Sequence, residues 1–254
     1  MIDIHALKRI ARMKGLTNMG HAEKDYFQEI LLLGVSRESP GLVFKGGTAL
    51  YKFHGLGRFS EDLDFSGRAG QRDLEKILSY LRDFGYESEV SSRNEARGKL
   101  LTFSVKGFLY RGTAQTLARI RMDVNPDSEV VLEPEYRMMY PLYPDLPPFG
   151  LRVMSLTEMA AEKMRALLIR AKARDAFDLW FMIGKGIAID AGLLDRKLEL
   201  YNMKAGAKLL DRALEKAQRS WNNELRPMVT AAPDYHSVEQ TIRGAFQAIG
   251  RGEV

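Results

Sequence analysis

The sequence predicts an α+β protein, with strands and helices mixed in its front half and helices alone in its back half. Three observations predict this arrangement. Short apolar or alternating runs, which are typical of strands, occur before Met154. Six prolines lie within residues 125–149, as expected of connecting segments that lead out of a first domain. From Ser155 onward, apolar residues recur at helical spacing. We therefore expect two domains, 1–154 and 155–254.

Two helices are expected before the first strand. Residues 4–16 place apolar and basic side chains on different sides of a helix, and residues 21–35 carry apolar side chains that pack inward. Pro40 and Gly41 end the second helix. A solvated surface is the simplest explanation of the basic side, and contact with RNA is the alternative. The basic residues in question are Lys8, Arg9, Arg12 and Lys14.

Residues 43–66 carry the most specific signal in the chain. A short apolar strand ends at Lys45 and leads into Gly46, Gly47 and Thr48, with an apolar helical patch behind them. Two glycines let backbone amides approach a phosphate closely, and the start of the following helix adds a partial positive charge. The pattern predicts a phosphate-binding turn.

Asp62 and Asp64 close this stretch. Side chains two residues apart on a strand lie on the same face, so the D-x-D pattern sends both carboxylates in one direction. Two aligned carboxylates suit a hard divalent cation such as Mg²⁺. A phosphate-binding turn and a metal pair within 24 residues favour nucleotidyl transfer, because that chemistry needs positioning and neutralisation of charge.

A third carboxylate is expected on a later strand. In residues 116–124 apolar and polar residues alternate, and Asp123 falls on the polar side. We expect Asp123 to complete a two-metal site with Asp62 and Asp64, and it is also a candidate for taking the proton of the acceptor hydroxyl. The elements expected before it are a helix at 73–84 and strands at 88–91 and 100–105.

A capping-box pattern at Ser155 and Glu158 predicts the start of a long helix with a break near Lys172. Asp175 falls on the apolar side of this helix, where an unpaired carboxylate is costly, so it needs a partner. Arg58 and Lys45 are the two candidates for that partner. Later helices are expected at 191–200, 205–221 and 237–249.

The same helix presents a cationic strip. Lys163, Arg170 and Arg174 share one face at about 100° per residue, and Asp178 lies at its edge. Such a strip could hold the triphosphate of a nucleotide. A solvated face with ion pairs between successive turns is the simpler alternative.

Composition excludes several classes of protein. The chain contains no cysteine, so disulfides, thiolate zinc sites and cysteine nucleophiles are excluded. No apolar run approaches the ~20 residues of a membrane span, and the first residues lack a signal-peptide layout. We therefore expect a cytoplasmic protein with no membrane contact. The net charge of +5 permits nucleic-acid binding without indicating it strongly. The four histidines have no metal-ligand spacing, and His54 is expected at the surface or at its boundary rather than beside a base.

The motifs resemble those of the AbiEii/AbiGii nucleotidyltransferase toxin family, which belongs to the DNA polymerase β superfamily and to type IV toxin–antitoxin systems. The resemblance rests on K-G-G-T-A-L at 45–50, R-F-S-E-D-L-D-F at 58–65 and K-x₆-R-x₃-R-D-x₂-D at 163–178. It covers roughly residues 40–185. The spacing of thirteen residues between Gly47-Thr48 and Asp62 is at the long end for the superfamily.

The resemblance implies a polymerase-β-like domain with a mixed sheet, followed by a helical domain that completes the nucleotide cleft. It implies transfer of a nucleoside monophosphate from an NTP to an RNA acceptor such as the tRNA 3′ end, with Mg²⁺ or Mn²⁺. It also implies a cognate antitoxin, for which a winged-helix regulator is a candidate. The implied catalytic residues are Asp62, Asp64, Asp123, Lys163 and Asp178, the first three of them metal ligands. The implied nucleotide-binding residues are Lys45, Gly46, Gly47, Thr48, Arg58, Ser60, Lys163, Arg170 and Arg174.

Two alternatives stay open at this point. The fold could act without catalysis, by holding RNA or a protein partner, which the positive charge and the basic first helix would favour. The enzyme could also modify protein hydroxyls or a small molecule instead of RNA.

Overall fold

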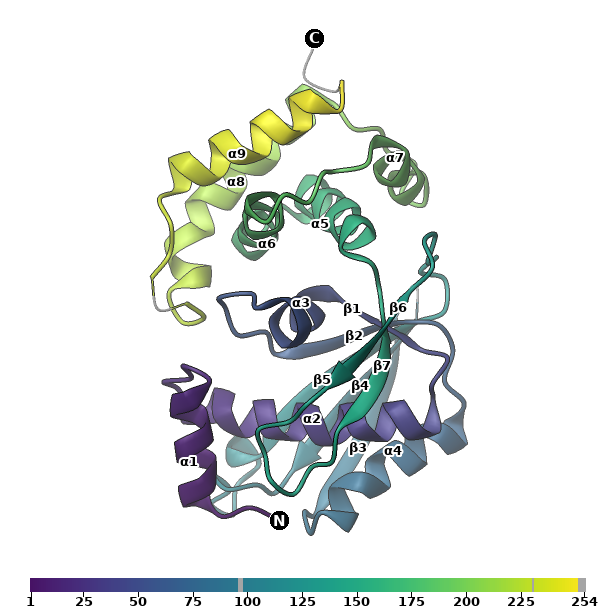
Figure 1. Cartoon of the computed structure of the whole chain (residues 1–254), viewed down its shortest axis with the longest axis vertical. Coiled ribbons are helices and arrows are strands. Elements are labelled where there is room, and N and C mark those ends of the chain that lie inside the picture. Colours follow the sequence, from purple (N-terminus) through teal and green to yellow (C-terminus); the bar gives the residue numbers. More distant parts are fainter. Residues whose placement is uncertain (96–97, 230, 251–254) are drawn as a thin grey trace. The chain divides into compact units, whose positions relative to one another are not determined.

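A computed structural model describes residues 1–95, 98–229 and 231–250 (Figure 1). The chain divides into two compact units. Unit 1 comprises residues 1–55, 59–130 and 134–153, and unit 2 comprises residues 56–58, 131–133 and 154–254.

Unit 1 is built on a mixed sheet. Within the described residues it has seven strands in the order β3-β4-β5-β2-β1-β7-β6. The pairs β2–β5 and β1–β7 are parallel, and the other neighbouring pairs are antiparallel. This confirms the predicted α+β class. The strands are β1 (Val43–Lys45), β2 (Asp62–Ser66), β3 (Ser88–Glu95), β4 (Gly98–Val105), β5 (Ala118–Asn125), β6 (Glu135–Met139) and β7 (Phe149–Val153).

Alternation of apolar residues along these strands decides which face becomes the core. In β5 every second residue from Ala118 to Val124 is buried, and the residues between them are exposed or half-buried. Phe44 of β1 and Phe65 of β2 are in register and in ring contact on the core face. Phe53 of the following helix packs edge-on against Phe44.

Helices cover this face (Figure 1). The 20-residue helix α2 packs against α4, β5 and β7, and buries polar as well as apolar side chains along most of its length. Gly55, with a φ of 74°, ends α3 in the left-handed conformation that glycine adopts without strain. The helices of unit 1 are α1 (Ile4–Met13), α2 (Met19–Glu38), α3 (Gly46–His54) and α4 (Gln71–Asp83), and a short 3₁₀ turn, η1 (Ala114–Thr116), precedes β5.

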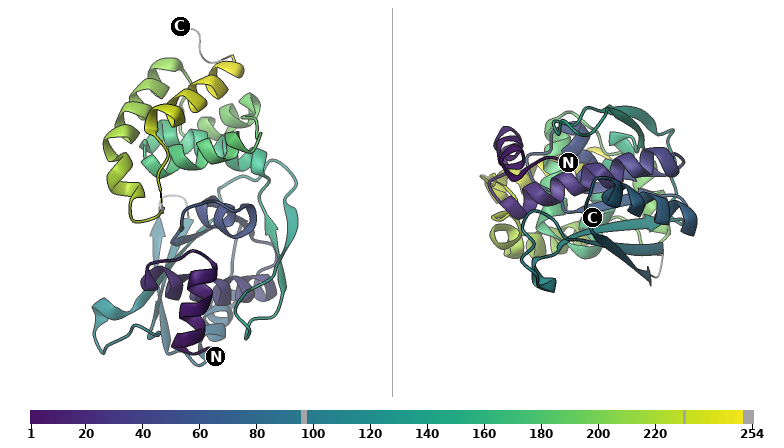
Figure 2. Two further views of the ribbon diagram at one scale, coloured as in Figure 1. Left: turned by 60° about the vertical axis from the view of Figure 1, so that its left-hand side comes forward. Right: turned by 90° about the horizontal axis from the view of Figure 1, so that it is seen from below.

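Unit 2 is helical, as expected. Ser155 caps α5 by accepting a hydrogen bond from the Glu158 amide at 3.3 Å. The expected break falls at Ala171, which adopts a left-handed φ of 52° and ends α5. Helices α8 and α9 both pack on α6, and Figure 2 shows them side by side. The helices are α5 (Leu156–Arg170), α6 (Ala173–Gly184), α7 (Ala191–Glu199), α8 (Ala207–Leu225) and α9 (Tyr235–Ala248). None of the helices in the described residues has the length and apolar character needed to cross a bilayer.

Candidate active site

A row of three charged side chains crosses the centre of the sheet in unit 1. Lys45 on β1 is in register with Asp64 on β2, and Asp64 is in register with Asp123 on β5. Residues directly opposite each other on neighbouring strands project from the same face. The two carboxylates are half-buried and Lys45 is buried. Two sequence-predicted metal ligands and one predicted nucleotide-binding residue therefore come together in one row.

Gly46 provides the room that Asp64 occupies. A Cβ atom added to Gly46 would lie 2.1 Å from Oδ2 of Asp64, and the φ of Gly46 is +76°. Both facts require glycine at this position. The sequence pattern predicted that glycine here lets the backbone approach phosphate closely. The structure shows that the absence of a side chain on Gly46 also makes room for the carboxylate of Asp64.

The N-terminus of α3 begins directly at this row. Lys45 is its N-cap residue, and its side chain makes no capping hydrogen bond to the helix. The first amides of a helix and its dipole attract anions. The hydroxyl of Thr48 donates to the backbone carbonyl of Asp62, so this side chain is engaged within the protein. What Thr48 can still offer a bound phosphate is its backbone amide.

Asp62 is held apart from the other two carboxylates. It is in register with Arg121, whose guanidinium donates to both carboxylate oxygens at 2.8 and 3.0 Å. Among the described residues, no three acidic or histidine side chains lie together in a metal-binding arrangement. The expected three-carboxylate group is thus not assembled in this conformation, because Arg121 offers Asp62 two donors from the neighbouring strand.

The environment of Asp123 favours its protonated form more than water would. Burial raises the pKa of the Asp123 carboxyl, the charges of Glu95 and Asp62 raise it further, and Lys45 opposes them. The ammonium of Lys45 donates to Oγ of Ser128 at 2.5 Å, and Oγ of Ser66 lies 3.0 Å from the same hydroxyl. Two hydroxyl groups therefore continue the row beyond Lys45, one from β2 and one from the segment after β5.

The donor set fits a hard divalent cation. Mg²⁺ is commonly held by one or two carboxylates together with substrate phosphates, and Asp64 and Asp123 are two carboxylates in register on one face. The glycine that a Cβ would fill keeps Asp64 in that position.

Unit 2 holds a second set of the predicted residues, joined in a chain of ion pairs that is buried except at Arg170. Arg58 binds both oxygens of Asp178 at 2.6 and 2.7 Å. Lys163 lies 2.6 Å from Asp178 and 3.4 Å from Asp175, and Arg170 binds both oxygens of Asp175 at 2.7 Å. Three cations face two carboxylates, which leaves one positive charge in excess.

The two carboxylates are ionised in this setting. Burial by itself would raise the pKa of Asp175, but Lys163 and Arg170 outweigh burial and lower the pKa to about 2. Burial likewise opposes ionisation of Asp178, and Arg58 and Lys163 lower its pKa. Bidentate arginine pairs of this kind are geometrically demanding.

Asp175 has partners, as expected. Its carboxylate binds Arg170 and Lys163, which were not the two candidates, and it also interacts electrostatically with Arg58, which was one of them. The left-handed residue Ala171 separates α5 from α6 and brings Asp175, in the first turn of α6, back to Arg170. The predicted cationic strip is broken at the same point. Arg174 belongs to α6, is half-buried and contributes to the lowered pKa of Asp175.

Sequence reasoning missed several residues of the site. Arg121 was visible as a polar residue of the alternating strand, but not as a partner of Asp62. Gln28 on α2 donates to the carbonyls of Ser60 and Glu61, and no sequence motif indicates this role.

Two residues named from the sequence lie apart from the row. Ser60 is buried, and His54 is half-buried at the end of α3. The nucleotide-binding role of Ser60 stays a prediction.

Comparisons with known proteins give the family and the fold. The model of the family described as Nucleotidyl transferase AbiEii toxin, Type IV TA system, matches residues 30–248. No match was found among curated protein sequences. The structure is similar to MenT4, a nucleotidyltransferase toxin from Mycobacterium tuberculosis H37Rv, with a TM-score of 0.69 and 24% identity over 96% of this chain and 89% of that one.

Two Helicobacter pylori structures share the fold as well. JHP933 has a TM-score of 0.62 and 18% identity over 98% of this chain and 93% of that one. A protein described as a putative nucleotidyltransferase has a TM-score of 0.53 and 17% identity over 91% of this chain and 96% of that one. At these identities the likeness concerns the fold.

A mixed sheet with a glycine turn, a helix N-terminus and in-register carboxylates is the framework of a nucleotidyltransferase. The family match extends over most of the chain, and the chain therefore belongs to the AbiEii nucleotidyl transferase toxin family of type IV toxin–antitoxin systems. The family relationship proposed from the motifs is confirmed. It implies an NTP substrate and an antitoxin partner.

Proposed function

We propose that this toxin transfers a nucleoside monophosphate from an NTP to RNA, with the 3′ end of tRNA as acceptor and Mg²⁺ or Mn²⁺ as cofactor. The observation that carries the proposal is the Lys45–Asp64–Asp123 row at the N-terminus of α3. A helix N-terminus with a glycine turn suits phosphate, and the carboxylates beside it suit the cation that accompanies a triphosphate.

The residues of the row and of the glycine turn have separate roles in binding the phosphate and the cation. The backbone amides of Gly46, Gly47 and Thr48 bind phosphate oxygens, and Lys45 adds a point charge at the same end of the helix. Asp64 and Asp123 would hold the cation, and Asp62 would be a third ligand once released from Arg121. A bound divalent cation would neutralise charge that develops on the phosphate oxygens.

The transfer itself is a displacement at the α-phosphorus of the NTP. The 3′ oxygen of the acceptor forms a new bond to phosphorus while the bond to the leaving pyrophosphate breaks. The proton of the acceptor hydroxyl passes to a carboxylate oxygen, and Asp123 is the residue we assign to it.

We assign the ion-pair chain of unit 2 to nucleotide binding. Arg58, Lys163 and Arg170 are held by Asp178 and Asp175, which fixes cations that would otherwise be mobile. The excess positive charge, with Arg174 beside it, suits a triphosphate. Asp178 would act by orienting Arg58 and Lys163.

The test is nucleotide transfer measured directly. Purified protein is incubated with total tRNA, Mg²⁺ and each α-labelled NTP in turn, and label in RNA is quantified. Asp64→Ala should lower transfer by about 100-fold or more, as expected when a group that stabilises transition-state charge is removed. Asp83→Ala, at an exposed position on α4, is the matched control and should transfer normally. Absence of label in RNA with every NTP would refute the proposal.

The same reaction discriminates the alternatives. Label in protein, or in a small molecule, would identify a different acceptor. A non-catalytic binding module predicts that Asp64→Asn still arrests growth, whereas changes to surface Lys and Arg residues abolish the effect in a salt-dependent way. An enzyme predicts the reverse for Asp64→Asn.

We further propose that the antitoxin is a winged-helix regulator encoded beside this chain and that both act in the cytoplasm. Type IV toxin–antitoxin membership supports a partner without specifying its fold. Co-expression of the neighbouring gene product should restore growth in cells that express the toxin. Failure of every neighbouring product to do so would contradict this proposal.

A further inference from the structure

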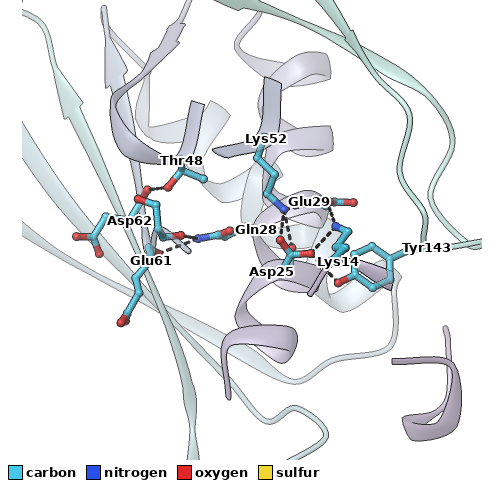
Figure 3. A network of polar contacts seen from close by, with 10 residues as sticks. Lys14, Asp25, Gln28, Glu29, Thr48, Lys52, Glu61, Asp62 and Tyr143 are labelled. Atoms are coloured by element: carbon cyan, nitrogen blue, oxygen red, sulfur yellow. Dashed lines mark hydrogen bonds and ion pairs between the residues drawn. The ribbon is translucent and has the colours of Figure 1, made fainter. Parts of the chain in front are cut away.

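The segment that leads into the catalytic strand is held by side chains of two helices. The side-chain amide of Gln28 on α2 donates to the backbone carbonyls of Ser60 and Glu61, both at 2.9 Å. The hydroxyl of Thr48 on α3 donates to the next carbonyl, that of Asp62 (Figure 3). Three successive carbonyls are therefore fixed from outside the sheet.

Strand β1 does not extend far enough to supply these hydrogen bonds. Strand β1 ends at Lys45, opposite Asp64, and the chain then turns into α3. Strand β2 therefore has no β1 residue paired with Asp62, and Thr48 supplies a donor there. One step earlier in the chain, Gln28 supplies the donors for Ser60 and Glu61. Backbone carbonyls that are removed from water need such partners.

Helix α2 also holds α3 in place. Asp25 and Glu29, one turn before and one residue after Gln28, both bind the ammonium of Lys52 on α3, at 2.6 and 2.8 Å. Both also bind Lys14 at 2.5 Å. Figure 3 shows this cluster beside Gln28. One helix thus fixes the glycine-turn helix and the approach to β2 at the same time.

Gln28 lowers the stability of the folded protein in a way that an apolar residue at this position would not. Its side chain is fully buried, and its Oε1 atom has no hydrogen-bond partner among the described residues. A buried acceptor without a partner is destabilising. The amide at this position is therefore best explained by its two donated hydrogen bonds.

We propose that Gln28 is a positioning residue for nucleotidyl transfer. This inference rests on the proposed function. Gln28 sets the path by which the chain enters β2, and hence the position of Asp62 and Asp64 relative to the amides at the start of α3. Catalytic groups must be held to within about 0.5 Å, and a displacement near 1 Å can lower a rate about 100-fold.

The test compares Gln28→Met, which keeps the length of the side chain and removes its donors, with Leu31→Ala on the same helix. Leu31 is fully buried, so its truncation destabilises unit 1 without removing the hydrogen bonds to residues 60 and 61. Melting temperature, kcat, KM for RNA and the Mg²⁺ concentration for half-maximal transfer are measured well below both melting temperatures.

Gln28→Met should lower kcat about 10-fold to 100-fold and raise the Mg²⁺ requirement, with the KM for RNA unchanged. Leu31→Ala should lower the melting temperature but leave kcat and the Mg²⁺ requirement as in the wild type. Equal kcat and equal Mg²⁺ response in the two variants would overturn the inference. A wild-type protein that transfers no nucleotide would refute the proposed function instead.

Thr48 provides a second test should Gln28→Met not fold. Thr48→Val keeps the shape of the side chain and loses the hydroxyl that donates to the carbonyl of Asp62. We expect Thr48→Val to shift kcat and the Mg²⁺ requirement in the direction given for Gln28→Met, with Leu31→Ala again as the control. Wild-type behaviour of Thr48→Val would show that these carbonyls need no external anchor.

Discussion

The carboxylate of Asp64 lies where a side chain on Gly46 would begin. Gly46 begins α3 directly after β1, and Asp64 lies on the neighbouring strand β2. A Cβ on Gly46 would be 2.9 Å from the carboxyl carbon of Asp64 as well as 2.1 Å from Oδ2. The glycine turn and the D-x-D strand therefore form one unit, in which the turn conformation and the carboxylate position depend on each other.

Gly46→Ala should abolish transfer by displacing Asp64. The residue also has a positive φ, which costs an L-residue about 1–2 kcal/mol. Gly55→Ala separates the two effects, because Gly55 has a similar φ of 74° but nothing within 4 Å of an added Cβ. Both variants should lose similar stability in urea unfolding, and only Gly46→Ala should lose at least about 100-fold in transfer. Equal transfer activities of Gly46→Ala and Gly55→Ala would contradict a role for the close approach of Gly46 to Asp64.

Arg121 should compete with the cation for Asp62. The pair is partly exposed, with 53% of the Arg121 side chain accessible, so its contribution to stability should be below about 1 kcal/mol. Arg121→Met should therefore barely change unfolding, while lowering the Mg²⁺ concentration needed for half-maximal transfer. Arg119→Met is the control, since Arg119 lies on the same face of β5 and binds the carbonyl of Ala114. If Arg121→Met, but not Arg119→Met, needed more Mg²⁺ for half-maximal transfer, then Arg121 would assist cation binding rather than compete with it.

Residues whose partners are local in sequence were the predictable ones. The glycine turn, the D-x-D strand and the alternating strand before Asp123 follow from spacing and from period-2 geometry, and the break near Lys172 follows from the change in pattern. Spacing also predicted the face on which Asp64 and Asp123 lie, and strand pairing then placed them in register.

Residues whose partners are distant could not be predicted in the same way. Glu158 fits a capping box, yet its carboxylate accepts from the amides of Val131 and Leu132, both at 2.9 Å, and from buried Lys197. Lys14 reads as part of a solvated basic face, but it enters the cluster on α2. In each case the pairing depends on packing between elements far apart in the chain, which periodicity does not encode.

Acid should destabilise unit 2 over a defined range. The pKa of Asp175 is about 2 in the folded protein and 3.8 as a reference, so its ionisation contributes about 2 kcal/mol of stability above pH 4. That contribution is lost as the pH falls from about 4 to 2, and Asp178, whose pKa is also lowered, acts in the same direction. Asp175→Asn should be less stable than wild type at pH 7 and should lose less stability between pH 5 and pH 3. Urea unfolding at these pH values measures both quantities. If Asp175→Asn lost as much stability between pH 5 and pH 3 as the wild type, the ion-pair chain would not be the cause of the acid destabilisation.

Lys197 and Glu158 should show strong coupling in a double-mutant cycle. Both side chains are buried, and their charged atoms are 2.5 Å apart. Lys197→Met leaves a buried carboxylate with two backbone donors but without its cation, which should cost about 3–5 kcal/mol. Glu158→Gln should cost a similar amount, because Lys197 then lacks its main counter-charge. The double variant should be less destabilised than the sum of the two, since neither charge of the Lys197–Glu158 pair is left buried without the other.

Lys208→Met, at an exposed position on α8, is the control and should leave the free energy of unfolding unchanged. Additive losses in the double variant would mean that Glu158 stabilises unit 2 through the amides of Val131 and Leu132 alone.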